Sequence, residues 1–197
     1  MGYTTYFSGQ FEFDKPVEPW LIEYVEKFCQ SRRMKRDNEK IKELYPKWKD
    51  LCFNGELGVE GEFFVGGIGF YGQTDEDSVI DHNRPPCTQP GLWCQWVITD
   101  DGKYLEWDGG EKFYEYVDWL VYMIGNFFAP LGYKLNGEVT FDGEDYDDIG
   151  VIYVKDNFVE VEYGVHCHSI SSMDDKTLID ELIKRGYTVT GKNYTEQ

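Results

Sequence analysis

Apolar and polar positions change their period several times along the chain, and the first changes predict one strand and two helices. Residues 3–13 are rich in β-branched and aromatic side chains, which favours a strand or hairpin with a kink at Gly9. Residues 17–34 repeat apolar side chains at helical spacing, which is typical of a helix with one buried face. A shorter helix is expected over 38–45, where Pro46 ends or bends it.

Glycines interrupt the next part of the pattern. Residues 63–65 and 68–71 resemble two strands, separated by a pair of glycines at 66–67. Residues 73–92 are polar and rich in proline, which predicts a long loop. Such loops are uncommon inside compact domains and are often functional.

The following residues alternate hairpin and helix signals. Residues 92–108 predict a hairpin that turns at the Asp-Gly pair 101–102, and residues 133–141 predict a further strand. Residues 111–129 give the clearest helical pattern, which Pro130 terminates. The expected buried face of this helix carries Tyr114, Val117, Val121, Ile124 and Phe128.

Residues 148–164 give the best-determined hairpin. A two-residue turn at 156–157 would pair Lys155 with Phe158 and would set the register of both strands. The pattern as a whole predicts an α+β fold, a mostly antiparallel sheet with two main helices packed on one face. We expect a single domain over 1–197, with residues 164–197 as a candidate peripheral appendage that contains a short helix.

Composition narrows the classes of function. The chain has 197 residues, of which 41% are apolar, with 19 Lys and Arg against 37 Asp and Glu. No apolar run approaches the ~20 residues of a membrane span, and no secretory leader pattern opens the chain, so we expect a cytoplasmic protein without a membrane partner. Five cysteines without a paired motif indicate free thiols in a reducing compartment.

The charge is unevenly distributed. Residues 1–50 carry ten basic and nine acidic side chains, whereas residues 51–197 carry nine basic and 28 acidic ones. An acidic surface repels phosphates and attracts basic partners, so direct binding of nucleic acid is not expected. The simpler interpretation is that the charge keeps the protein soluble.

The first candidate site lies between residues 66 and 107. It combines glycines that let a ligand approach the backbone, a polar loop, and tryptophans that offer flat apolar surfaces. Its residues are Gly66, Gly67, Gly69, Asp81, His82, Asn83, Arg84, Trp93, Gln95 and Trp107. The structural alternative is that the glycines form bulges, the tryptophans pack, and Arg84 pairs with Asp81.

Histidines suggest two weaker sites. His82, with Asp81 beside it, could act as a general base or as part of a carboxylate-rich metal site, although a single loop histidine is usually a polar surface residue. His166 and His168 share a face if their segment is extended, but no neighbouring residue completes a metal site. We therefore assign no catalytic residue, metal or cofactor.

Carboxylates form the last candidate. Glu138 and Asp142 begin a run of acids, and a second acidic cluster lies in the polar loop. The candidate partner-binding residues are Asp75, Glu76, Asp77, Asp142, Glu144, Asp145, Asp147 and Asp148. They form either a solvated loop or a charge array that imitates the phosphates of DNA and occupies a basic groove.

Two stretches resemble a known family. The opening MGYTT-x-F-x-G and the blocks FVGGIGFYGQ, NRPPCTQPGLWCQW, EWDGGEKFY and LNGEVTFDGED resemble an uncharacterised family of small bacterial and bacteriophage proteins. The resemblance covers most of residues 1–160, whereas residues 35–53 and the tail from about 164 depart from it. It implies a prokaryotic or phage cytoplasmic setting and no particular activity.

Three hypotheses about function follow. The leading one is a non-enzymatic protein that docks its acidic surface on a basic partner, which could be a protein that handles nucleic acid. The rival is a small-molecule or nucleotide-binding domain, conceivably an enzyme, that uses the first candidate site. A third is a structural component of a larger particle, and the sequence leaves the oligomeric state open.

Overall fold

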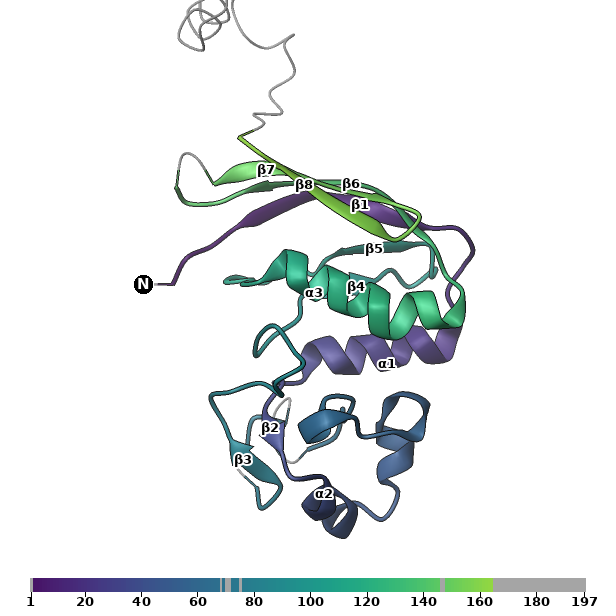
Figure 1. Cartoon of the computed structure of the whole chain (residues 1–197), viewed down its shortest axis with the longest axis vertical. Coiled ribbons are helices and arrows are strands. Elements are labelled where there is room, and N and C mark those ends of the chain that lie inside the picture. The colour runs from purple at the N-terminus through teal and green to yellow at the C-terminus, as the bar shows by residue number, and fades with distance from the viewer. Residues whose placement is uncertain (1, 68, 70–71, 75, 146–147, 165–197) are drawn as a thin grey trace, which may run out of the picture. The chain divides into compact units, whose positions relative to one another are not determined.

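The computed structural model describes residues 2–67, 69, 72–74, 76–145 and 148–164 (Figure 1). The expected helix beyond residue 174 and the pair His166 and His168 lie outside these residues. None of the helices described is long and apolar enough to cross a bilayer.

A six-stranded antiparallel sheet has the order β4-β5-β1-β6-β7-β8. Its strands are β1 (Tyr6–Phe13), β4 (Trp96–Ile98), β5 (Tyr104–Trp107), β6 (Leu135–Asp142), β7 (Ile149–Lys155) and β8 (Phe158–Tyr163). Helices α1 (Pro19–Gln30) and α3 (Tyr116–Met123) pack on one face of the sheet (Figure 1). The predicted α+β class and its antiparallel sheet are therefore confirmed.

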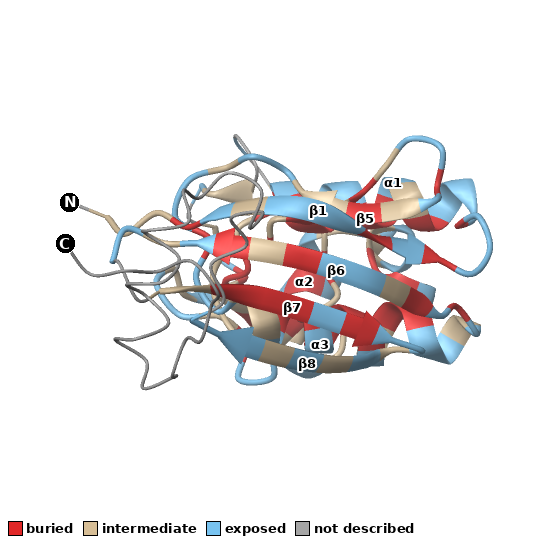
Figure 2. Ribbon diagram, turned by 90° about the horizontal axis from the view of Figure 1, so that it is seen from above, coloured by how far each residue is buried: buried red, intermediate tan, exposed pale blue. Residues whose placement is uncertain are grey.

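The β7–β8 hairpin shows how local chemistry sets the register. Asp156 and Asn157 adopt φ values of 48° and 72°, which are those of the primed turns that match strand twist. Lys155 pairs with Phe158, as the turn predicts. Buried and exposed segments alternate along β6 beside this hairpin, because one face of the sheet covers the core (Figure 2).

The predicted helix over 111–129 begins later than expected, and its buried face is different. Tyr114 and Val121 are 52% and 51% exposed, whereas Trp119 and Leu120 are fully buried. Residues Ile124–Phe128 form a π-helical turn after α3, and this wider turn rotates the buried side relative to a regular helix. The expected face was wrong in its first half, because Tyr114 lies before α3, beyond the left-handed Glu115, and Val121 lies on the exposed side of the helix.

Aromatic side chains dominate the core between the sheet and the helices. Phe11, Trp96, Trp119 and Phe127 have no exposed surface. Their rings meet edge to face, as for Phe11 and Trp96, whose centroids lie 5.6 Å apart.

A small lobe, residues 35–81, lies on the side of α1 that faces away from the sheet (Figure 1). It contains β2 (Lys35–Arg36), α2 (Asn38–Leu44), β3 (Val79–Asp81) and the 3-10 turns Trp48–Leu51, Phe53–Gly55 and Val59–Gly61. Strands β2 and β3 pair antiparallel. The lobe has its own apolar cluster, which consists of Ile41, Cys52, Leu57 and Phe64.

Two predictions fail in the small lobe. Residues 63–65 form no strand, and Phe64 makes only an isolated bridge to Cys52. The glycines on either side, Gly61 and Gly67, have φ values of 78° and 152°, which a regular strand does not accommodate. The loop expected over 73–92 contains β3, whose partner β2 is distant in sequence.

Candidate functional site

A cleft of about 690 Å³ opens at the end of α1, where the chain leaves the small lobe and returns to the sheet. Its walls come from residues before β4 and from the turn that precedes α3. The lining residues are Arg32, Asn83, Pro85, Pro90, Gly91, Leu92, Trp93, Gln95, Glu111, Lys112, Tyr114 and Glu115.

Arg32 and Trp93 form one wall of the cleft. The guanidinium carbon of Arg32 lies 6.0 Å from the centre of the Trp93 ring. Arg32 Nε donates to the carbonyl oxygen of His82 at 3.0 Å, and Nη2 donates to Asn83 Oδ1 at 3.2 Å. Partial burial lowers the pKa of Arg32. No carboxylate within the described ranges forms an ion pair with this guanidinium, so its charge is held in place but not neutralised.

Gln95 supports the turn that precedes α3. Its Nε2 donates to the Glu111 carbonyl oxygen at 2.9 Å, and its Oε1 accepts from Trp107 Nε1 at 3.1 Å. In the same turn, Lys112 and Glu115 have φ values of 63° and 53°, in the left-handed region. Such backbone conformations cost about 1–3 kcal/mol each and are concentrated at functional sites.

Gly91 separates the cleft from a buried donor. A Cβ atom at Gly91 would lie 3.4 Å from Trp119 Nε1. This indole nitrogen is buried and has no hydrogen-bond partner in the part of the chain that is described. A buried donor without a partner is unusual in folded proteins, but Trp119 is fully buried and is not one of the residues that line the cleft.

The cleft collects part of the first sequence-predicted site. Asn83, Trp93 and Gln95 line it, and Trp107 holds Gln95 from behind. Arg32, at the end of α1, was missed as a site residue. The helix predicted over 17–34 includes this residue, whereas α1 ends at Gln30 and the fold brings Arg32 to Trp93.

The other residues of the predicted loop have structural roles. Arg84 Nε lies 3.6 Å from Asp81 Oδ2, and the Arg84 side chain is 80% exposed, as the structural alternative expected. His82 Nε2 lies 2.8 Å from the Gln73 carbonyl oxygen, to which it donates. Neither Arg84 nor the His82 ring lines the cleft.

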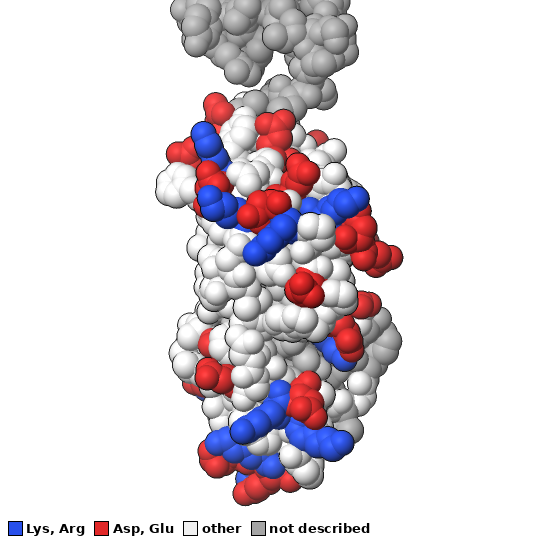
Figure 3. Space-filling view, turned by 90° about the vertical axis from the view of Figure 1, so that its right-hand side faces the viewer, with Lys and Arg blue, Asp and Glu red and all other residues white. Residues whose placement is uncertain are grey.

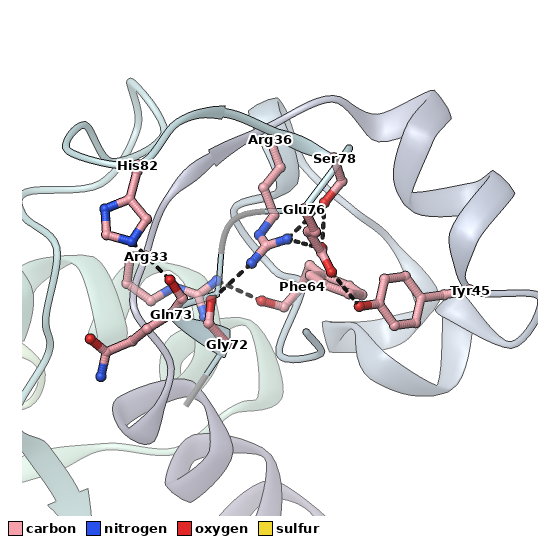
Figure 4. A network of polar contacts seen from close by, with 9 residues as sticks. All are labelled: Arg33, Arg36, Tyr45, Phe64, Gly72, Gln73, Glu76, Ser78 and His82. Carbon is pink, nitrogen blue, oxygen red and sulfur yellow. Dashed lines mark hydrogen bonds and ion pairs between the residues drawn. The ribbon is translucent and has the colours of Figure 1, made fainter. Parts of the chain in front are cut away.

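Glu76 belongs to a buried network of the small lobe, which Figure 4 shows. Arg36 Nη1 pairs with Glu76 Oε1 and also donates to Ser78 Oγ at 2.7 Å, and Tyr45 OH donates to Glu76 Oε2 at 2.7 Å. The side chains of Arg36 and Glu76 are only 4% and 3% exposed. Arg36 Nη2 donates to the Gly72 carbonyl oxygen at 3.3 Å, which connects β2 to the backbone at Gly72 within the lobe.

This network corrects the placement of Glu76 on an acidic partner-binding surface. Burial raises the pKa of Glu76, but hydrogen bonds from Ser78 and Tyr45, with the charge and hydrogen bond of Arg36, lower the pKa below its ordinary value. The carboxylate is therefore charged and neutralised inside the protein, where a partner does not reach it.

The predicted glycines serve close packing in the same lobe. A Cβ at Gly66 would lie 2.7 Å from the Phe64 ring, and one at Gly67 would lie 2.9 Å from the Cα atom of Gly72. Gly69 has a φ of 81°, which favours glycine. None of the three lines the cleft.

The predicted acidic array is dispersed. Asp77, Asp142, Glu144 and Asp145 are exposed, whereas Asp148 Oδ2 accepts a hydrogen bond from Tyr3 OH at 2.5 Å. Figure 3 shows one face on which Lys and Arg stand among Asp and Glu, over the sheet and over the small lobe, with a largely uncharged band between them. Asp75 and Asp147 lie outside the described residues.

No three His, Cys, Asp or Glu side chains within the described ranges gather closely enough to hold a metal ion. Comparison of the chain with protein-family models, curated proteins and solved structures finds no match.

Proposed function

We propose that the protein is a binding module and that the cleft between Arg32 and the 111–115 turn is its ligand site. The observation that carries this proposal is the convergence of an aromatic face, Trp93, with a charged but unpaired guanidinium, Arg32, at one concave surface. This proposal keeps the small-molecule hypothesis from the sequence analysis, but the cationic residue of the site is Arg32 instead of Arg84.

The size and the lining of the cleft support the proposal. Ligand sites usually have volumes of roughly 300–1,000 Å³ and combine apolar walls with a few convergent polar groups. The cleft holds about 690 Å³. Pro85, Pro90 and Leu92 supply apolar surface, while Asn83 and Arg32 supply the polar groups.

A thermal-shift panel of metabolites tests the proposal. A ligand that binds only the folded protein raises the melting temperature by mass action. We expect a hit whose shift is lost in Trp93→Ala and retained in Trp20→Ala. Trp20 is a matched control because it is 47% exposed and lines a separate cavity beside Lys49. Equal loss in both variants, or no hit in the panel, would contradict the assignment.

A second proposed function is docking on a basic protein partner. It is favoured by Asp142, Glu144 and Asp145, which are exposed and have no ion-pair partner within the described part of the chain. A contact of this kind is strongest at low ionic strength.

Pull-down from bacterial lysate at several salt concentrations tests this second function. We expect a basic protein that is retained at low salt and lost in the triple variant Asp142→Asn, Glu144→Gln, Asp145→Asn. The control neutralises the exposed Asp100 and the half-buried Glu106, which lie at the β4–β5 edge of the sheet and line a different pocket. Retention that is insensitive to salt and to the triple variant would rule out the proposed surface.

A further inference from the structure

We infer that the cleft recognises a planar ring that carries a single carboxylate or phosphate group, and that Arg32 binds the anionic group. This inference rests on the proposed function of the cleft and adds the chemical class of the ligand to it.

The first argument is the state of the Arg32 guanidinium. Two of its nitrogens, Nε and Nη2, are fixed by the His82 carbonyl oxygen and by Asn83 Oδ1. Nη1 forms no hydrogen bond to any residue that the structure describes. The nearby cations Lys35 and Arg84 have their own carboxylates, Glu60 and Asp81. Arg32 therefore presents a positive charge and unused donors to the cleft, in an orientation set before any ligand arrives.

The second argument is the geometry of the Arg32–Trp93 contact. A guanidinium can stack on an aromatic face while the donors at its edge match the paired oxygens of a carboxylate or phosphate. The guanidinium carbon lies 6.0 Å from the centre of the Trp93 ring, which is at the outer limit of a cation–π contact. Trp93 thus helps to orient the guanidinium, and the exposed Tyr114 ring together with Pro85 and Pro90 leaves flat apolar surface for the rest of the ligand.

The third argument limits the charge of the ligand. Glu111 and Glu115 line the same cleft. Lys112 also lines it, and its Nζ atom lies 4.0 Å from Glu111 Oε2, so its charge is paired with a carboxylate. The whole chain carries a formal charge of −18. This field disfavours a polyanion, so a single anionic group opposite Arg32 fits better than the linked phosphates of a triphosphate.

Isothermal titration at low salt with matched probes tests the inference. The probes are 1-naphthoate, its neutral amide 1-naphthamide, and the cation 1-naphthylmethylamine, which share one ring. A second arm compares adenosine monophosphate with adenosine triphosphate, which share one ring system, and tests the limit on charge. Because hydrogen bonds to charged groups contribute about 1.5–3 kcal/mol, we expect the carboxylate to bind at least about tenfold more tightly than the amide.

Variants of Arg32 provide the decisive comparison. Arg32→Gln should remove the preference for the carboxylate and leave the amide affinity unchanged, while Arg32→Lys should keep part of it. Arg84→Gln is the matched control because its exposed guanidinium lies outside the cleft. An unchanged denaturation curve shows that each variant is folded.

The outcomes separate the two proposals. Equal binding of the three naphthyl probes, or a carboxylate preference that survives in Arg32→Gln, would overturn the inference and leave the cleft as a ligand site. Tighter binding of the triphosphate than of the monophosphate would overturn the limit on charge. Failure of all five probes to bind the wild-type protein would contradict the inference, and the metabolite panel with Trp93→Ala would then decide on the cleft itself.

Discussion

The layer of sheet and helices differs from the small lobe in what stabilises it. Beneath the sheet, Trp96, Trp119 and Phe127 are fully buried within a continuous aromatic core. Among the described residues, the separate cluster of the small lobe buries four apolar side chains, and the buried pair of Arg36 and Glu76 lies beside it. The first region is maintained by the area of apolar surface removed from water, and the second depends on a few polar contacts that must all be satisfied.

This difference predicts that the small lobe is more sensitive to acid than the sheet layer. Acid has little direct effect on a purely apolar core, whereas it acts directly on a buried carboxylate. The chain segment that carries Asn83 and Trp93 runs from the small lobe to the sheet, so the cleft contains residues anchored in both regions. Loosening the lobe should therefore disturb the cleft before the sheet unfolds.

The largest effect is expected in the sheet layer. Trp96→Ala should lower the free energy of unfolding by about 4 kcal/mol, because it leaves a large cavity among Phe7, Phe11 and Phe113. It also removes the donor to the Tyr116 carbonyl oxygen. Denaturation by urea, followed by circular dichroism, measures the change. A loss below about 1 kcal/mol would mean that this core repacks freely.

The next largest effect is expected in the small lobe. Arg36→Met should lower the free energy of unfolding by about 3 kcal/mol, because it leaves the Glu76 carboxylate buried without its cation. Native-state hydrogen exchange should show the lobe opening first, at the Asp37 amide that donates to the Ser78 carbonyl oxygen.

A surface pair serves as the control for this variant. Lys27→Met breaks the exposed pair with Glu23 and should change the free energy of unfolding by less than about 0.5 kcal/mol. Equal effects of the two variants would contradict a special role for the buried pair.

Acid should separate the two regions further. The pKa of Glu76 is lower in the folded protein than its ordinary value, so the unfolded chain binds this proton more readily. The stability that Glu76 contributes is present above the ordinary glutamate pKa of about 4.3 and is lost as the pH falls below it. Hydrogen exchange at the Asp37 amide across this range, compared between wild type and Glu76→Gln, measures the effect. The same pH dependence in both proteins would assign it to other carboxylates.

The smallest effect concerns one helix end. Asp37 caps α2, and its Oδ1 accepts from the Glu39 amide at 2.8 Å. Asp37→Ala should lower the free energy of unfolding by about 1 kcal/mol, while Asp37→Asn should restore most of this loss. Thermal melts of the two variants provide the measurement, and equal melting temperatures for both would exclude a capping role.

The sequence predicts the sheet well because its signals are local. The Asp-Asn pair at 156–157 determines its own turn and the register of the hairpin. Alternation along β7 agrees with the burial of Ile152 and Val154, although Val151 on the other face is buried as well and Tyr163 of β8 is 64% exposed. The helix before residue 129 was harder to predict, because the left-handed Glu115 delays its start and a π-helical turn follows it, and neither leaves a clear mark in the hydrophobic period. The fold class therefore follows from short-range chemistry, and the errors arise where the backbone departs from a regular period.

Only part of the candidate site could be predicted from local sequence patterns. Asn83, Trp93 and Gln95 stand close together in the chain, so their composition could be noticed. Arg32 precedes them by about 50–60 residues in the sequence and contacts Asn83 and Trp93 only in the folded protein. Glu76 is buried against Arg36, because strands β2 and β3, which are distant in sequence, pair with each other. Contacts of this kind depend on the tertiary fold, which one sequence does not reveal.

Amide and indole NMR shifts on addition of 1-naphthoate test most directly whether the cleft is a ligand site for an anionic ring. We expect perturbations at the Trp93 indole N–H and at backbone amides of residues 83–95 and 110–115, with little change along β7 and β8. Perturbations centred on Trp20 and Lys49, or scattered over the surface without saturation, would contradict the assignment of the cleft.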